Sequence, residues 1–246
     1  ERTDNNTISD ITASTTASFG NGSGAGLVNT GEVLAIEYKG TNIDETPAIS
    51  ACNGWCGGSS ASGQYWTMER YDPLATGTSS TNWGSWAGFL NNGLNADNAA
   101  INGTPGKRNS INYLITKGAG PLSQNKTLAT SSSPYIISNA FTIDSGRTLT
   151  VNPGVVIKFL ESSSLAINGA IDAQGTASNN IVFTSIKDDT YAGDTNQDGS
   201  ATAPAAGNWN TIKVLANGSI FDRAVIRYGG YKDTPTAAHF ANLRVE

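Results

Sequence analysis

The octet GDTNQDGS, residues 193–200, has oxygen-bearing side chains at every second position. An acidic residue, an amide and a second acidic residue stand two positions apart, and a glycine follows them directly. An EF-hand loop begins in this way, because alternate side-chain oxygens bind Ca²⁺ and a glycine allows the chain to bend. The spacing therefore predicts calcium ligands at Asp194, Asn196, Asp198 and Ser200.

The rest of the loop departs from the EF-hand pattern. An EF-hand needs a bidentate Glu at its twelfth position, and here that position is Ala205. Two interpretations remain open. One is a structural Ca²⁺ whose shell is completed by Asp188, Asp189 or backbone carbonyls. The other is a polar turn, since Asp and Asn tolerate turn geometry. In both, residues from about 187 to 208 form a long polar loop.

The remaining charged residues do not form a pattern that is typical of acid–base catalysis. A glycoside hydrolase needs two carboxyl groups on either side of the scissile bond. Asp188 and Asp189 are adjacent, so in a strand they would point to opposite faces. His239 is the single histidine. Isolated basic residues that could contact an anionic sugar are Lys158, Arg223 and Arg227. We expect no enzymatic activity.

Two cysteines lie in the segment ACNGWC. Cys52 and Cys56 could close a small disulfide loop, although so short a loop is tight for disulfide geometry and the alternative is two free thiols. A disulfide would indicate an oxidising, extracellular compartment.

Four tryptophans lie close together in the first half of the chain: Trp55, Trp66, Trp83 and Trp86. Such a group can stack against sugar rings. In a small β domain, however, large aromatic side chains more often form the core, and we favour the core.

The overall composition indicates an all-β extracellular protein. The chain has 246 residues, of which only 14% are charged, and its formal net charge is −5. This balance argues against a nucleic-acid partner, which requires a basic surface. No apolar run approaches the ~20 residues that cross a bilayer. Ser, Thr, Asn and Gly predominate over helix-forming residues, which favours strands and turns.

The first half resembles a known family. Its segments YWTMERYDP, STNWGSW and NGTPGKRNS, preceded by VLAIEYKGTNIDETPAI, resemble the bacterial lamin-tail domain over residues 28–110. The resemblance implies a small immunoglobulin-like β-sandwich that acts as a non-catalytic extracellular module. Residues 111–133 are expected to form a short strand and a linker.

From residue 134 onward, apolar runs of three to five residues recur between Gly, Asn, Asp and Pro. Strands this short are stable only when stacked, as in a solenoid. Residues 149–151 and 165–167, 16 positions apart, are expected to occupy similar places in the repeat. The phrases GRTLTVNPGVVIKF and LAINGAIDAQGT resemble the first coils of right-handed parallel β-helices in secreted bacterial proteins.

The expected architecture is therefore all-β. A lamin-tail-like sandwich (1–110) and a strand with linker (111–133) precede a parallel β-helix (134–246) that is incomplete at its C-terminus. The expected function is a non-catalytic structural or adhesive element of a bacterial cell surface, such as a surface layer, fibre or adhesin stalk. The expected partners are further copies of the chain or other surface proteins. A glycan-binding module, or a β-helix polysaccharide lyase or hydrolase, is the alternative. We expect no cofactor other than a structural Ca²⁺.

Overall fold

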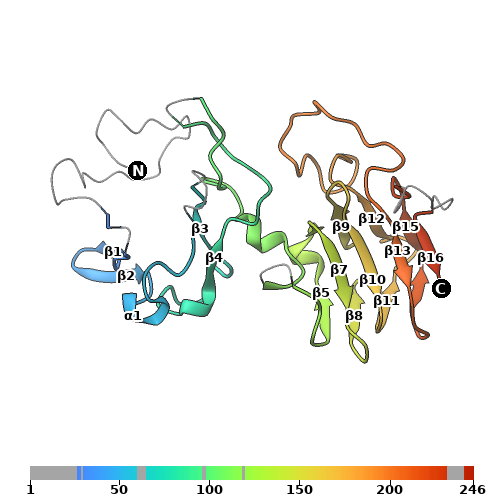
Figure 1. The fold of residues 1–246 in the computed structure, drawn as a ribbon, viewed down its shortest axis with the longest axis horizontal. Helices are drawn as coiled ribbons and strands as arrows, with labels where there is room; N and C mark the ends of the chain where they lie inside the picture. The colour runs from blue at the N-terminus through green and yellow to red at the C-terminus, as the bar shows by residue number, and fades with distance from the viewer. Residues whose placement is uncertain (1–26, 29, 60–64, 96–97, 118–119, 232–240) are drawn as a thin grey trace. The chain divides into compact units, whose positions relative to one another are not determined.

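The computed structural model describes residues 27–28, 30–59, 65–95, 98–117, 120–231 and 241–246 (Figure 1). The chain divides into two compact units, Glu1–Asn112 and Tyr113–Glu246. No helix in these described stretches is long and apolar enough to cross a membrane.

The first unit contains short elements joined by long turns. Among its described residues the strands form two antiparallel pairs, β1 with β2 and β3 with β4. The elements are β1 (Ala35–Tyr38), β2 (Thr41–Glu45), α1 (Ile49–Cys52), β3 (Met68–Arg70), the 3₁₀ turn Ser80–Asn82 and β4 (Trp83–Ser85). The predicted immunoglobulin-like sandwich is not confirmed, because the described strands make two separate two-stranded sheets.

A buried carboxylate organises the interior of this unit. Glu69 on β3 is only 3% exposed. It accepts hydrogen bonds from the Thr104 hydroxyl at 2.7 Å, the Ser110 hydroxyl at 2.6 Å and the Ile111 amide at 3.2 Å. Polar groups removed from water must be hydrogen-bonded. Glu69 therefore fastens the segment 104–111 onto β3.

The second unit is a stack of parallel strands in three sheets. Each sheet takes every third strand in chain order (Figure 1). The first sheet has β5 (Lys126–Leu128), β8 (Thr148–Val151), β11 (Ala170–Gln174) and β14 (Ile220–Asp222); the second has β6 (Tyr135–Ile137), β9 (Val156–Phe159), β12 (Ile181–Ser185) and β15 (Ala224–Ile226); the third has β7 (Ala140–Ile143), β10 (Ser164–Ile167), β13 (Ile212–Val214) and β16 (Leu243–Val245). This arrangement confirms the predicted parallel β-helix.

The register corrects the expected repeat. Leu149 pairs with Ile171, and Phe141 pairs with Leu165. One coil therefore takes 22 residues between β8 and β11 and 24 residues between β7 and β10. The 16-residue spacing joins β8 to β10, which lie in different sheets. The prediction was wrong because apolar triplets from different sheets look alike in the sequence.

Side chains on alternate positions fill the interior. In β8 and β10 the inward positions are fully or nearly fully buried and the positions between them are half-exposed, as a period of two requires. Leu149, Leu165 and Ile171 have no exposed surface, and each such side chain contributes about 2 kcal/mol by its burial. Phe159 and Trp209 stack in the same core with ring centroids 4.1 Å apart.

The segment predicted as a strand and linker, 111–133, differs from expectation. A 3₁₀ turn covers Ser110–Tyr113. Leu122 bridges to Ile143, and β5 is hydrogen-bonded alongside β8. Leu122 and Leu128 are buried in the core of the β-helix. This segment therefore forms a first coil of the β-helix. The sequence did not predict it, because polar residues surround the two leucines.

Candidate functional site

The sheet that contains β9 and β12 is buried on both faces, unlike its neighbours. All four residues of β9 and all five of β12 are buried. Ile157, Phe159, Ile181 and Phe183 point into the core, so the alternate positions are covered from outside. At two of these positions, Lys158 and Thr184, the contacts come from the long loop between β12 and β13, which is the orange excursion in Figure 1.

A lysine attaches this loop to the sheet. Lys158 lies on the outer face of β9 and has no exposed surface. Its ammonium donates hydrogen bonds to the carbonyl oxygens of Asp188 at 2.9 Å and Gly193 at 2.8 Å. Burial lowers the pKa of Lys158 from its ordinary 10.5 to about 8, while the carboxylates of Asp189, Asp188 and Asp194 act in the opposite direction.

Asp188 completes the attachment from the loop side. Its carboxylate is fully buried and accepts hydrogen bonds from the Thr184 hydroxyl at 2.6 Å and the Thr190 amide at 3.2 Å. Arg227 Nε lies 3.8 Å from the same carboxylate. Thr184 stands beside Lys158 in the register of β12 and β9. Lys158 and Thr184, which are neighbours on the outer face of two successive coils, thus both form hydrogen bonds with Asp188 in the loop.

The neighbouring Asp189 belongs to a separate cluster of carboxylates. Carboxylate oxygens of Asp189, Asp194 and Asp198 lie within 4.8 Å of one another. The structure thereby brings together two of the predicted ligands, Asp194 and Asp198, with Asp189. Asp188 and Asp189, although adjacent in the chain, therefore belong to separate groups.

Three buried side-chain oxygen atoms of this loop have no hydrogen-bond partner among the residues that the structure describes: Oδ1 of Asp189, Oδ1 of Asn196 and Oδ1 of Asn210. The first two belong to the carboxylate group and to the octet beside it. A buried acceptor without a donor costs about 1–3 kcal/mol. The three close carboxylates form an all-oxygen donor set, which suits Ca²⁺, and Asn196 lies beside them with its amide nitrogen donating to Asp198 at 2.7 Å. The residues present therefore fit a calcium ion.

Two of the same carboxylates, those of Asp194 and Asp198, also accept hydrogen bonds from backbone amides within the turn. Asp194 accepts the backbone amides of Asp198 at 3.1 Å and Gly199 at 3.0 Å. Asp198 accepts the Ser200 amide at 2.9 Å, and a hydrogen bond from Thr202 is the main cause of the lowered pKa of the Asp198 carboxyl. Ser200 thus enters the turn through its backbone. Both interpretations of the octet use the same residues.

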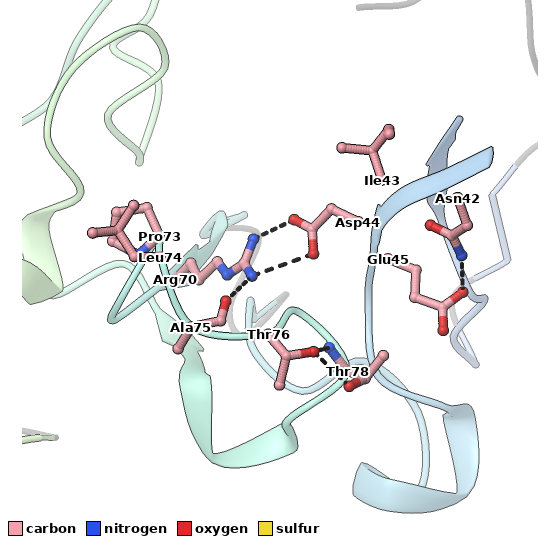
Figure 2. Close-up of a pocket in the computed structure, with 10 residues that line it drawn as sticks. All are labelled: Asn42, Ile43, Asp44, Glu45, Arg70, Pro73, Leu74, Ala75, Thr76 and Thr78. Atoms are coloured by element: carbon pink, nitrogen blue, oxygen red, sulfur yellow. Dashed lines mark hydrogen bonds and ion pairs between the residues drawn. The ribbon is translucent and has the colours of Figure 1, made fainter. Parts of the chain in front are cut away.

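The first unit contains an open cleft of about 660 Å³ beside β2 (Figure 2). The Arg70 guanidinium donates to both Asp44 oxygens and to the Ala75 carbonyl. The hydrogen bond from Arg70 is the main reason that the pKa of Asp44 is lowered. The Asn42 amide donates to Glu45 at 2.7 Å. The terminal nitrogens of Arg70 are thus bound within the lining, while its buried Nε has no hydrogen-bond partner in the described part of the chain. The lining has two carboxylates and one cation.

The tryptophans do not present two exposed rings side by side. Trp86 is buried, Trp55 and Trp83 are half-buried, and Trp66 is 39% exposed. Trp66 meets Trp86 edge to face, with ring centroids 5.7 Å apart. Trp83 donates from its indole to the Gly77 carbonyl at 2.7 Å. These contacts are those of packed side chains rather than of a flat sugar-binding platform.

Other predicted residues are placed as follows. Cys52 and Cys56 form a disulfide. Arg223 is exposed, and His239 lies outside the described residues. The roles of Lys158 and of the Asp44–Arg70 pair were not predicted from the sequence. A signal for Lys158 was available, because a lysine inside the apolar run VVIKF must find partners where its neighbours are buried.

Comparison with known proteins gives one family and one relative. The model of the pectate-lyase-like beta helix domain matches residues 120–246, just over half of the chain. Protein bark beetle of Drosophila melanogaster is 35% identical over 82 residues, which cover 33% of this chain and 3% of that protein. The chain therefore spans only a small fraction of this relative. No solved structure matches the chain.

Proposed function

The chain belongs to the family of pectate-lyase-like beta helix domains, and from this premise we propose that it is a non-catalytic structural and adhesive module of a cell surface. One observation carries the proposal: the two fully buried charged residues of the described β-helix, Lys158 and Asp188, hold the loop. Lys158 is bonded to two backbone carbonyls and Asp188 to two loop or strand donors. Groups bound in this way are not available to bind a sugar or transfer its protons.

A structural Ca²⁺ is part of this proposal. Asp189, Asp194, Asp198 and the Asn196 amide oxygen would hold the ion, and the unpartnered oxygens of Asp189 and Asn196 support this assignment. When bound, the ion would supply positive charge that offsets the repulsion between the carboxylates. The chain's own residues position the site: Lys158 fixes Gly193, and Asp194 follows directly.

The extracellular location is also proposed. The Cys52–Cys56 disulfide supports it, because disulfides persist in oxidising compartments. The covered sheet supports a structural role, since a loop fixed on one face of the β-helix stiffens two successive coils.

The cleft beside β2 is proposed as the adhesive contact. Its carboxylates outnumber its one cation, and it offers acceptors: the Glu45 carboxylate and the Thr76 and Thr78 hydroxyls. Ile43 and Leu74, 60% and 95% exposed, flank it. This lining suits a lysine or arginine side chain of another surface protein, whose aliphatic stem would contact the apolar residues.

The non-catalytic assignment is tested by incubating the purified chain with polygalacturonate and with alginate, each with and without CaCl₂. We expect no shortening of either polymer beyond a buffer control. Depolymerisation that disappears in Asp189→Asn would overturn the proposal and establish the lyase alternative.

The cleft is tested separately by calorimetry with a lysine-containing peptide and its norleucine counterpart. Binding of the lysine peptide alone, lost in Glu45→Gln and kept in Glu161→Gln of the second unit, is expected. Equal binding of both peptides, or none, would remove the cleft from the adhesive role.

A further inference from the structure

Five Asn-Gly pairs lie in the described part of the chain, and the structure treats them differently. They are Asn53-Gly54, Asn92-Gly93, Asn102-Gly103, Asn168-Gly169 and Asn217-Gly218. An Asn-Gly pair can cyclise because glycine has no side chain to shield its backbone nitrogen. The reaction requires that this nitrogen lose its proton and reach the asparagine side-chain carbon. A hydrogen bond to either group opposes it.

In three pairs the glycine amide is already bound. Gly54 donates to Ile49 at 3.1 Å, Gly103 to Ile101 at 2.8 Å and Gly169 to Ile143 at 3.1 Å. Gly169 is also tightly packed, because a Cβ there would lie 2.2 Å from the Arg147 carbonyl oxygen. In a fourth pair, the Asn92 side chain donates to the Pro105 carbonyl at 2.6 Å.

Asn217 and Gly218 differ from these four pairs. They lie in the turn between β13 and β14, where Asn217 is exposed. Among the described residues, neither the Asn217 side chain nor the Gly218 amide has a hydrogen-bond partner. Gly218 has φ +97°, and no described heavy atom lies within 4 Å of the place that its Cβ would take. Both reacting groups are therefore free to move.

We propose that Asn217 is a site of spontaneous deamidation. The Gly218 nitrogen, after losing its proton, attacks the side-chain carbonyl carbon of Asn217. A carbon–nitrogen bond forms, the side-chain carbon–nitrogen bond breaks, and ammonia leaves. Water then opens the cyclic imide at one of its two carbonyls and gives aspartate or isoaspartate. In total one water is consumed and one ammonia is released, with no oxidant or reductant.

The product changes the next coil. It adds a negative charge to the turn, and the isoaspartate form routes the main chain through the former side chain. Two residues later the Ser219 hydroxyl accepts the Ile171 amide at 3.3 Å, and Ile220 pairs with Asp172. Because isoaspartate lengthens the main chain of the turn, Ser219 and Ile220 would move away from their partners on β11. We therefore infer that β14 loosens from β11 as the protein ages.

The test is slow incubation of the folded chain at neutral pH and physiological temperature, followed by trypsin and mass spectrometry. Cleavage after Lys213 and Arg223 yields the peptide 214–223, whose single asparagine is Asn217. The peptide 159–187 carries Asn168 and is the internal control. We expect deamidation several-fold faster at Asn217 than at Asn168, with isoaspartate as a product.

A second arm separates structure from sequence. In urea the two Asn-Gly pairs should react at similar rates, because both are then unprotected. Asn217→Gln should stop the reaction at this position without altering the fold. Equal rates at Asn217 and Asn168 in the folded chain, or no reaction at Asn217, would overturn the proposal. Neither result bears on the proposed structural and adhesive function, which the polymer and peptide assays test.

Discussion

Lys158 Nζ donates a hydrogen bond to the carbonyl oxygen of Gly193, 2.8 Å away and 35 positions later in the chain. The residue after Gly193 is the first predicted calcium ligand, Asp194. An ammonium group buried under the loop is therefore the cation that the structure uses to fix the start of the octet. The proposed Ca²⁺ would bind elsewhere in the loop, at the carboxylates of Asp189, Asp194 and Asp198.

Replacing Lys158 by Met should destabilise the β-helix. The substitution leaves the carbonyls of Asp188 and Gly193 without their donor, at a cost of about 1–3 kcal/mol for each buried group. Part of this cost is offset because a charged group no longer has to be buried. We expect a net loss of about 2 kcal/mol in the free energy of unfolding in urea. Arg147→Met removes an exposed charge of the same sign and is the control.

The loop itself should respond to that substitution. Amide exchange of residues 187–208 should rise in Lys158→Met and stay unchanged in Arg147→Met. A loop that exchanges equally slowly in both variants would show that Lys158 does not hold it.

The titration of Lys158 should appear in the pH dependence of stability. The pKa of Lys158 is about 8 in the folded chain and 10.5 when unperturbed. Between these values the unfolded chain binds more protons than the folded chain, so the free energy of unfolding rises with pH. The contribution is absent below about 8 and complete above about 10.5.

Other groups titrate in the same range, so the measurement is a comparison. The wild-type free energy of unfolding should rise more steeply than that of Lys158→Met between these two pH values, by at most about 3 kcal/mol. Parallel pH profiles of the two proteins would contradict a lowered pKa for Lys158.

Calcium should stabilise the second unit. An ion that binds only the folded chain adds about 2.7 kcal/mol when its concentration is a hundredfold above Kd. We therefore expect CaCl₂ to raise the melting temperature and EDTA to reverse the rise. Asp189→Asn should abolish the effect, because it removes one of three converging carboxylates. Asp222→Asn removes an exposed carboxylate on β14 and should leave the effect intact. A melting temperature indifferent to calcium would establish the octet as a polar turn.

The β-helix could be predicted from local sequence because its signals are local. Runs such as TLTV and SLAI alternate buried and half-exposed residues, and turns separate them. The repeat length could not be read in this way. Strand pairing depends on which run returns to the same sheet after a full coil, and the triplets of different sheets are equally apolar.

The candidate site was predictable only in part. The types and spacing of Asp194, Asn196 and Asp198 are visible in the sequence. The apolar run around Lys158 indicates that this lysine is buried, but it does not indicate its partner, because Gly193 follows 35 positions later and is brought near by the stacking of β9 on β12. The Asp44–Arg70 pair joins β2 to β3 across 26 positions of turns and loops, which no periodic pattern marks.

Replacing Glu69 by Ala should destabilise the first unit. The two hydroxyls and one amide that Glu69 accepts would remain buried without an acceptor. Together with the cavity left behind, this should cost about 3 kcal/mol or more. The loss should appear as faster amide exchange at Ile111 and in segment 104–111, with the β-helix amides unchanged. Glu37→Ala removes an exposed carboxylate on β1 and should have no such effect. Slow exchange of segment 104–111 in Glu69→Ala would mean that contacts other than this carboxylate fasten it to β3.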